Sequence, residues 1–157
     1  YEKVTYFGRG PQENYSDRYD GIFLGTWDTS AAGMMFNYVY PQENGNRTSV
    51  RWISMTDLQG RGIQFLGVEP LSVSVWNTTQ EEIQKARHID EPQMLRDAFT
   101  INVDHVQTGV GGTDSWSQRA RPSDQYRLMD KNYSYSFYIR PVKSRSDAIS
   151  AGRRLCR

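Results

Sequence analysis

The chain of 157 residues has little cysteine and histidine, no excess charge of one sign and no long apolar run. Its one cysteine, Cys156, cannot form an intrachain disulfide, so cysteine usage gives no information about the redox compartment. No apolar run approaches the ~20 residues of a membrane-spanning helix. Nineteen Lys and Arg residues offset 18 Asp and Glu residues, and the net charge of +1 is too small for a nucleic-acid-binding or membrane-binding surface. We therefore predict neither a nucleic-acid nor a membrane partner.

The two histidines give no support for a metal site in this chain. His88 and His105 are far apart in the sequence, and neither belongs to an H-x-x-x-H pattern. His105 continues the inward-facing phase of an alternating strand, so we interpret it as a hydrogen-bonded, partly buried histidine. His88 ends a short helical pattern, where a cation suits the helix dipole.

Local signatures of catalysis are missing as well. The sequence has no G-x-S-x-G nucleophile elbow, and Cys156 lies in a basic tail without a neighbouring histidine. The acidic residues of the loops show no spacing that marks two of them as an acid and a nucleophile; they are Glu13, Asp17, Asp20 and Glu43. We predict no catalytic residue in this chain.

Two of these acids have arginines close by in the sequence. We interpret Glu13 and Glu43 as members of ion pairs that brace their loops, each contributing about 0.2–1 kcal/mol. The arginines concerned are Arg9 and Arg18 for Glu13, and Arg47 and Arg51 for Glu43.

The sequence has several short segments in which apolar and polar residues alternate. Leu71, Val73 and Val75 alternate with serines, for example. This period of two is typical of strands that turn one face to a core. The predicted strands cover residues 4–7, 22–27, 35–39, 49–56, 63–66, 71–75, 99–106 and 133–139, and the short turn 57–60 predicts a hairpin.

One segment predicts a helix. Thr79 and Glu82 form an S/T-x-x-E capping box, Glu81 and Lys85 are an i,i+4 pair, and the pattern ends near His88. Many strands and one short helix predict an all-β fold, an antiparallel β-sandwich. We expect one domain unit over residues 1–142 and a polar C-terminal tail, loose or weakly helical, over residues 143–157.

The most informative loop is QTGVGGTDSW, residues 107–116. Its glycines allow backbone angles closed to other residues, and Asp114 and Ser115 favour turns, so Trp116 is placed on a tightly folded loop. The indole either covers the edge of the sandwich or forms a flat wall for the C–H face of a pyranose such as galactose. The residues alone leave both interpretations open.

Three long blocks of sequence carry a family resemblance. They are FGRGPQENYSDR (7–18), YPQENGNRTSVRW (40–52) and QTGVGGTDSW (107–116). In order and approximate spacing they resemble the C-terminal small-chain domain of glycoside hydrolase family 2 β-galactosidases, and the resemblance reaches to about Pro141. Two positions depart from it: Thr108 stands where many relatives have Met, and Thr113 where many have a second Asp.

The resemblance implies a large antiparallel supersandwich, similar to galactose mutarotase folds. It would pack against a (β/α)8 barrel that carries two catalytic glutamates and the Mg²⁺ site. Trp116 would line the galactose pocket, on a loop shaped by Asp114 and Ser115. The implied function is that of the C-terminal domain of a retaining β-galactosidase, which hydrolyses terminal β-D-galactosides such as lactose. This domain would complete the pocket and buttress the barrel without being catalytic alone, and we expect no cofactor in this chain.

The resemblance also implies partners: a β-galactoside substrate, the catalytic barrel of the same protein, and further copies in a homo-oligomer. We expect the chain to be the C-terminal part of the family domain, somewhat more than half of it. In isolation it would then self-associate through uncovered strand edges. The preferred galactoside and the native assembly stay open. The compartment, bacterial periplasm or cytoplasm, is open too, with the periplasm slightly preferred.

Two other classes of function stay in view. A mutarotase-like enzyme, with His105 and a Glu as acid and base, follows from fold analogy alone, and interconversion of α- and β-galactose would reveal it. A free-standing carbohydrate-binding module would bind galactose with a change in tryptophan fluorescence. We expect no interconversion and very weak binding, because one stacking wall without polar partners does not orient a sugar.

Overall fold

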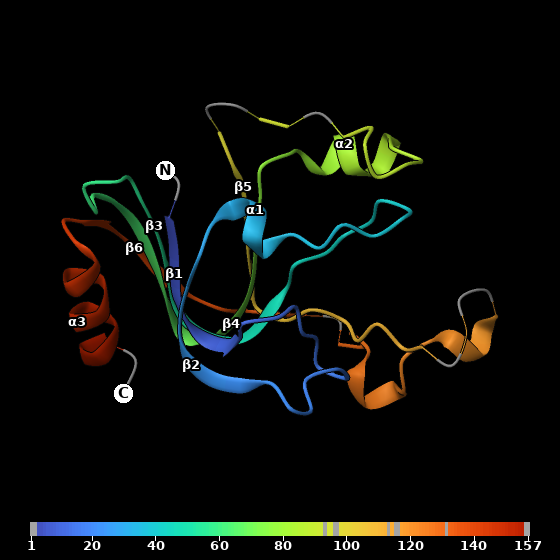
Figure 1. The fold of residues 1–157 in the computed structure, drawn as a ribbon. Helices are drawn as coiled ribbons and strands as arrows, with labels where there is room; N and C mark the ends of the chain where they lie inside the picture. Colours follow the sequence, from blue (N-terminus) through green and yellow to red (C-terminus); the bar gives the residue numbers. More distant parts are fainter. Residues whose placement is uncertain are drawn as a thin grey trace.

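A computed structural model describes residues 3–92, 94–95, 98–112, 114, 117–130 and 132–155. Its strands are β1 (Lys3–Gly10), β2 (Phe23–Thr29), β3 (Arg47–Thr56), β4 (Gly62–Trp76), β5 (Thr100–Asp104) and β6 (Phe137–Val142). They form one antiparallel sheet in the order β2-β1-β3-β4-β5, with β6 also paired to β4. The predicted all-β class is confirmed, and the mostly antiparallel structure is consistent with a β-sandwich (Figure 1).

The two strands predicted at 63–66 and 71–75 are one long strand, β4. Pairing with β3 changes register between Trp52↔Leu66 and Val50↔Leu71, so a bulge takes up the residues between the two apolar runs. A bulge interrupts the alternation without ending the strand, which is why the sequence pattern shows two segments. The first half of β4 pairs with β6 and the second half with β5.

The hairpin and the capped helix are confirmed. In the β3–β4 turn, the Asp57 carboxylate accepts hydrogen bonds from the Gln59 and Arg61 amides, and Gly60 adopts a φ of +80°. Helix α2 (Gln80–Lys85) begins after Thr79, whose hydroxyl accepts from the Glu82 amide. It ends at Lys85, earlier than predicted.

Three segments differ from the prediction. Residues 35–39 form no strand, because helix α1 (Ala31–Met34) precedes them and the Asn44 side chain accepts a hydrogen bond from the Phe36 amide. β6 begins at Phe137, four residues later than the alternation suggests. Short 3-10 helices occupy Gln118–Ala120 and Asp124–Tyr126.

Of the two states predicted for the C-terminal segment, the structure shows the helical one. Helix α3 (Arg145–Leu155) lies against the sheet on the side away from α1 (Figure 1). Ala148, Ala151 and Gly152 are buried, and the two alanines pack with Trp52 and Leu66 in an apolar cluster. Small residues spaced three and four apart let the helix approach the sheet closely, which the polar composition of the segment conceals.

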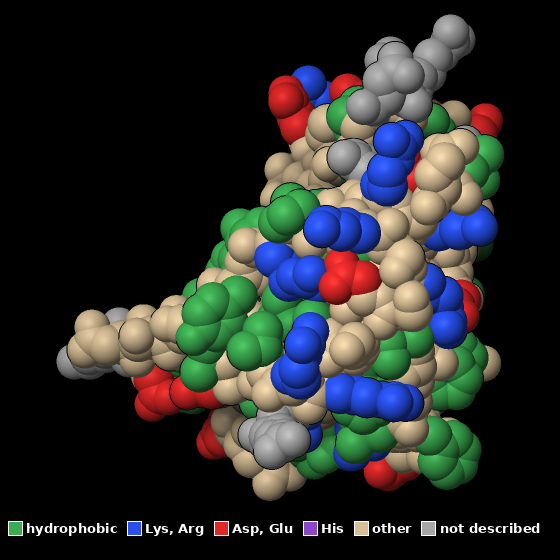
Figure 2. Space-filling view, turned by 90° about the vertical axis from the view of Figure 1, so that its left-hand side faces the viewer, with side chains coloured by type: hydrophobic (Ala, Val, Ile, Leu, Met, Phe, Trp, Pro, Cys, Tyr) green, Lys and Arg blue, Asp and Glu red, His purple; other side chains and the backbone are tan. Residues whose placement is uncertain are grey.

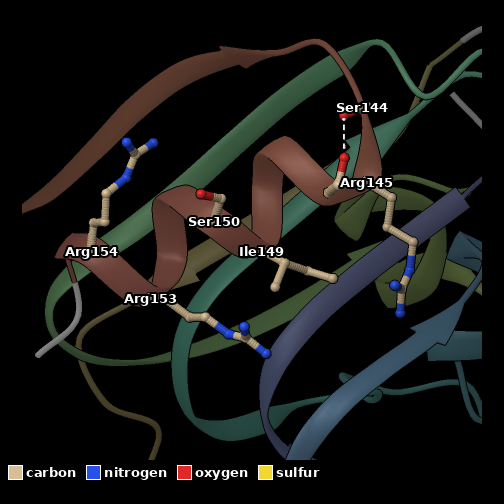
Figure 3. Close-up of a pocket in the computed structure, with 7 residues that line it drawn as sticks. Ser144, Arg145, Ile149, Ser150, Arg153 and Arg154 are labelled. Carbon is tan, nitrogen blue, oxygen red and sulfur yellow. Dashed lines mark hydrogen bonds between the residues drawn. The ribbon is translucent and has the colours of Figure 1, made fainter.

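Polar contacts anchor the start of α3. Arg140 donates two hydrogen bonds of 2.9 Å to Asp147 and a third to the fully buried Gln64, which in turn donates to the Ala148 carbonyl. Figure 2 shows the face that carries α3, where many Lys and Arg side chains gather. In Figure 3, Ile149 and Arg153 point from the helix toward the strands.

The main core lies on the other face of the sheet. It is built from the inward residues of β1, β3 and β4 together with α1. Its fully buried side chains include Tyr6, Met34, Ile53, Leu71 and Val73. Among the described residues, no helix has the length and apolar content to cross a membrane.

Candidate functional site

The glycine loop of the third block is clamped by an acid of the first block. The Asp17 carboxylate accepts hydrogen bonds from the Val110 amide (3.0 Å) and the Gly111 amide (2.8 Å), across more than 90 residues of sequence. Arg18 donates to the Gly111 carbonyl at 3.3 Å. A carboxylate that accepts two backbone N–H groups fixes the local path of the chain. Figure 1 shows the segment after β1 beside the segment that holds the 3-10 helices.

Two glycines of this loop are required by geometry. Gly111 has a φ of +67°, and a Cβ there would lie 1.8 Å from the Ala120 carbonyl oxygen. A Cβ at Gly109 would lie 2.5 Å from the Asp17 carboxylate. The glycines therefore let the loop approach both the clamp and the following segment.

Asp114, predicted to support the loop of Trp116, lies within the described residues. Asp114 accepts a hydrogen bond from the Ser117 amide at 2.7 Å and another from the Ser117 hydroxyl. These bonds hold Ser117 against the Asp114 carboxylate. The other two predicted site residues, Ser115 and Trp116, lie outside the described residues.

Asparagines join the first block to the second. Asn14 is fully buried, donates to the Arg9 and Gln12 carbonyls, and accepts from the amide and hydroxyl of Thr48. Asn46 donates to the Asn14 carbonyl at 2.9 Å. The Asn14 and Asn46 side chains therefore position the loop of the first block against that of the second.

The predicted bracing ion pairs are replaced by tyrosine–carboxylate hydrogen bonds. Tyr15 donates to Glu43 at 3.0 Å, and Tyr38 donates to Glu13, which also accepts the Gly45 amide. Arg47 is buried and donates to Tyr6 and to backbone carbonyls, so it does not pair with Glu43. Arg9 lies over the Tyr19 ring, 4.2 Å from its centroid. In the fold, Arg9, Arg18 and Arg47 contact carbonyl oxygens or a ring rather than the acids near them in sequence.

This cluster holds its tyrosines neutral. Burial raises the pKa of Tyr15, and the neighbouring Glu43 carboxylate raises it further. Burial and the hydrogen bond to Glu13 raise the pKa of Tyr38 to about 12. The Glu43 side chain is partly exposed, but its partial removal from water still raises its pKa. The nearby Glu13 and Asp104 carboxylates raise this pKa further. The tyrosines therefore act here as hydrogen-bond donors.

A cavity of about 520 Å³ opens where the three blocks meet. Its lining comes from the first block (Tyr15, Arg18), the second (Gln42, Glu43) and the third (Val110, Gly112, Asp114), with Tyr38 and Ala120 beside them. Its volume falls in the range of small-molecule sites. In the part of the chain that is described, no three His, Cys, Asp or Glu side chains gather as a metal site would need.

His105 is partly buried, as predicted, but its Nδ1 lacks the expected hydrogen bond. This nitrogen is buried and lies 3.8 Å from the Glu69 carboxylate, which is too far for such a bond. The ring stacks on Tyr135 with centroids 5.6 Å apart.

Sequence reasoning missed the roles of Asp17 and Asn14. Both lie in the first block of the resemblance, so the sequence identified their segment but not the residues that they contact. A hydrogen bond across 93 or 34 residues has no local signature, because loop pairing depends on how the sheet brings distant segments together.

Known proteins match this chain over most of its length. Residues 1–139 match the family described as Beta galactosidase small chain, and the chain belongs to that family. It is 34% identical to a beta-galactosidase of Priestia megaterium and 37% identical to one of Halalkalibacterium halodurans, over 90% of this chain in each case. It is also 35% identical to the beta-galactosidase BgaC of Bifidobacterium adolescentis over 82% of its length. The chain spans 12–14% of the length of these relatives.

Proposed function

We propose that this chain is the C-terminal small-chain domain of a retaining β-galactosidase that hydrolyses terminal β-D-galactosides such as lactose. The Asp17 clamp carries the proposal together with the family match. It fixes the glycine loop, in the same block as Trp116, at a cavity lined by all three blocks.

Trp116 supplies the wall of the galactose pocket in this proposal. The C–H face of a galactose ring packs on an indole, and a ring that gains positive charge in the transition state is attracted further by the π face. Asp114 supports the wall by bonding to Ser117 across the turn. The cavity lined by the three blocks offers hydroxyl, amide and carboxylate groups for sugar hydroxyls.

The chemistry itself belongs to another domain. A (β/α)8 barrel of the same protein would contribute the two catalytic glutamates and hold Mg²⁺, and this chain would buttress that barrel without being catalytic alone or binding a cofactor. The sheet would be part of a larger supersandwich. The full protein would form a homo-oligomer, and edge strand β2 carries exposed Phe23 and Leu24 for such contacts.

Substitution of Trp116 in the intact protein tests the proposal. We expect Trp116→Ala to lower kcat/KM for a nitrophenyl β-galactoside by about tenfold or more, because loss of a stacking contact costs about 1 kcal/mol in binding and more as the ring gains charge. Trp116→Phe should recover part of the loss. Trp27→Phe is the matched control, since Trp27 lies on β2 and donates to the Gly8 carbonyl. Unchanged kinetics for Trp116→Ala would contradict the role of Trp116, and absence of β-galactosidase activity in the wild-type protein would contradict the function.

A further inference from the structure

A second cavity has a volume of about 470 Å³. We call it the His105 cavity; the residues that matter below are Ser16, His105, Gln107, Tyr126, Arg127 and Tyr133. Some residues of its lining are bonded to, or follow in sequence, residues of the first cavity or its glycine loop. Ser16 follows Tyr15 of the first cavity, and the Tyr126 carbonyl accepts the Gly109 amide of the glycine loop at 2.7 Å.

Unpaired polar atoms mark the His105 cavity. The Ser16 hydroxyl and His105 Nδ1 are two of the three buried side-chain polar atoms without a hydrogen-bond partner in the described residues. Leaving such an atom unpaired costs about 1–3 kcal/mol, and native structures retain few of them. Both residues line the cavity, and each has a side-chain torsion that can redirect its polar atom.

The lining of the cavity includes the aromatic side chains of His105, Tyr126 and Tyr133, and Tyr135 packs behind His105. His105 stacks on Tyr135 and meets the edge of Tyr133 at 6.4 Å between centroids. Hydrogen bonds hold the tyrosines, since Tyr135 donates to the Val103 carbonyl and Tyr133 accepts the Asp130 amide. A fixed aromatic group beside hydroxyl and amide groups suits a ligand with both C–H faces and hydroxyls.

The charges of the lining do not favour an ionic ligand. Arg127 forms an ion pair with Asp124 at 2.7 Å, which leaves it less free to hold an anion. The lining also includes one acid, Asp130, and otherwise neutral polar side chains such as Gln107, Gln125 and Asn132. A neutral, polyhydroxylated ligand matches this set better than a phosphate, a carboxylate or a metal ion.

We propose that the His105 cavity is a second saccharide subsite, which binds a neutral sugar unit of a longer galactoside whose terminal galactose occupies the pocket at Trp116. This inference rests on the proposed function and adds to it a preference for substrates of three or more sugars. Ser16 and His105 donate to or accept from the hydroxyls of the added unit, and the aromatic group supports its C–H face.

Equilibrium binding to the full-length protein tests the subsite. The probes are a non-hydrolysable thio-linked trisaccharide, galactosyl-galactosyl-glucose, and methyl thio-β-galactoside, both titrated by calorimetry. We expect the wild-type protein to bind the trisaccharide at least fivefold more tightly than the monosaccharide. Ser16→Ala should reduce this preference by about threefold to tenfold, the worth of one hydrogen bond, and His105→Phe should reduce it similarly while keeping a ring.

The thermal stability of the ligand-free variants separates binding from folding. Ser16→Ala removes an unpaired hydroxyl, so its Tm should equal or exceed that of the wild type, whereas a structural hydroxyl would lower Tm on removal. Ser150→Ala, an exposed hydroxyl on α3, is the matched control and should change neither the preference nor the Tm. A wild-type preference below twofold, or a preference unchanged by Ser16→Ala, would overturn the subsite. The galactose pocket is tested separately: loss of binding of both probes in Trp116→Ala would support it, whatever the result for Ser16→Ala. The two proposals therefore fail separately.

Discussion

The two ends of this molecule are held by different kinds of contact. At the α3 end, apolar surfaces of Ala148, Ala151 and Trp52 pack together, with one polar network at the start of the helix. At the loop end, single side-chain atoms of Asp17, Asn14 and Glu13 accept backbone amides or donate to backbone carbonyls. The α3 end should therefore be sensitive to added volume, and the loop end to the loss of one acceptor atom.

Adding one methyl group at Gly152 tests the α3 end and should have the largest effect. A Cβ there would lie 2.1 Å from Trp52 Nε1, and Trp52 is buried. We expect Gly152→Ala to lower the free energy of unfolding by about 1–3 kcal/mol, measured by urea denaturation. Helix propensity alone would raise it by about 1 kcal/mol, so the sign of the change decides between the two effects.

A second helix position provides the control. Ser150→Ala on the exposed side of α3 should leave stability unchanged or slightly raised. A stabilised Gly152→Ala variant would show that α3 does not rest on Trp52 in the folded protein.

Removing the Asp17 carboxylate tests the loop end and should have an intermediate effect. We expect Asp17→Ala to cost about 1–2 kcal/mol, because two backbone amides lose a partly exposed acceptor. Hydrogen exchange at the Val110 and Gly111 amides should rise at the same time, since their opening becomes easier. Asp17→Asn, which keeps one acceptor oxygen, should lie between the wild type and Asp17→Ala.

Asp20→Ala is the matched control for the clamp, because Asp20 is exposed on the same loop. Protection of Val110 and Gly111 that is equal in Asp17→Ala and Asp20→Ala would show that the loop holds its shape without the clamp.

The pH dependence at Glu43 should be the smallest effect. The pKa of Glu43 is raised in the folded protein, so its contribution to the free energy of unfolding is fullest below the ordinary pKa of 4.5. That contribution is lost as pH rises through the raised folded pKa. Glu43→Gln keeps an acceptor for Tyr15 and removes the titration, so its stability relative to the wild type should increase between pH 4.5 and 7.

Urea denaturation at several pH values measures this difference, with Asp90→Asn at an exposed position as the control. A difference that stays constant with pH would mean that Glu43 titrates alike in the folded and unfolded chains.

Prediction from sequence succeeded where the cause was local. Alternation such as that of Leu71, Val73 and Val75 placed most strands, and the Thr79–Glu82 capping box placed α2, because each depends on residues within a few positions. It missed the packing of α3 on the sheet, since polar composition hides three small residues that matter only against Trp52. It also paired Glu13 and Glu43 with arginines nearby in sequence, whereas the fold supplies Tyr38 and Tyr15.

By itself the sequence determined the all-β class, the hairpin, the capped helix and the membership of a family, through short-range periodicity and three long blocks of residues. Only the tertiary structure decided that Asp17 holds the glycine loop, that α3 covers Trp52 and that residues of all three blocks line one cavity. The physical reason is range. Backbone periodicity acts over a few residues, while these contacts join segments that only the paired sheet brings within hydrogen-bonding and packing distance.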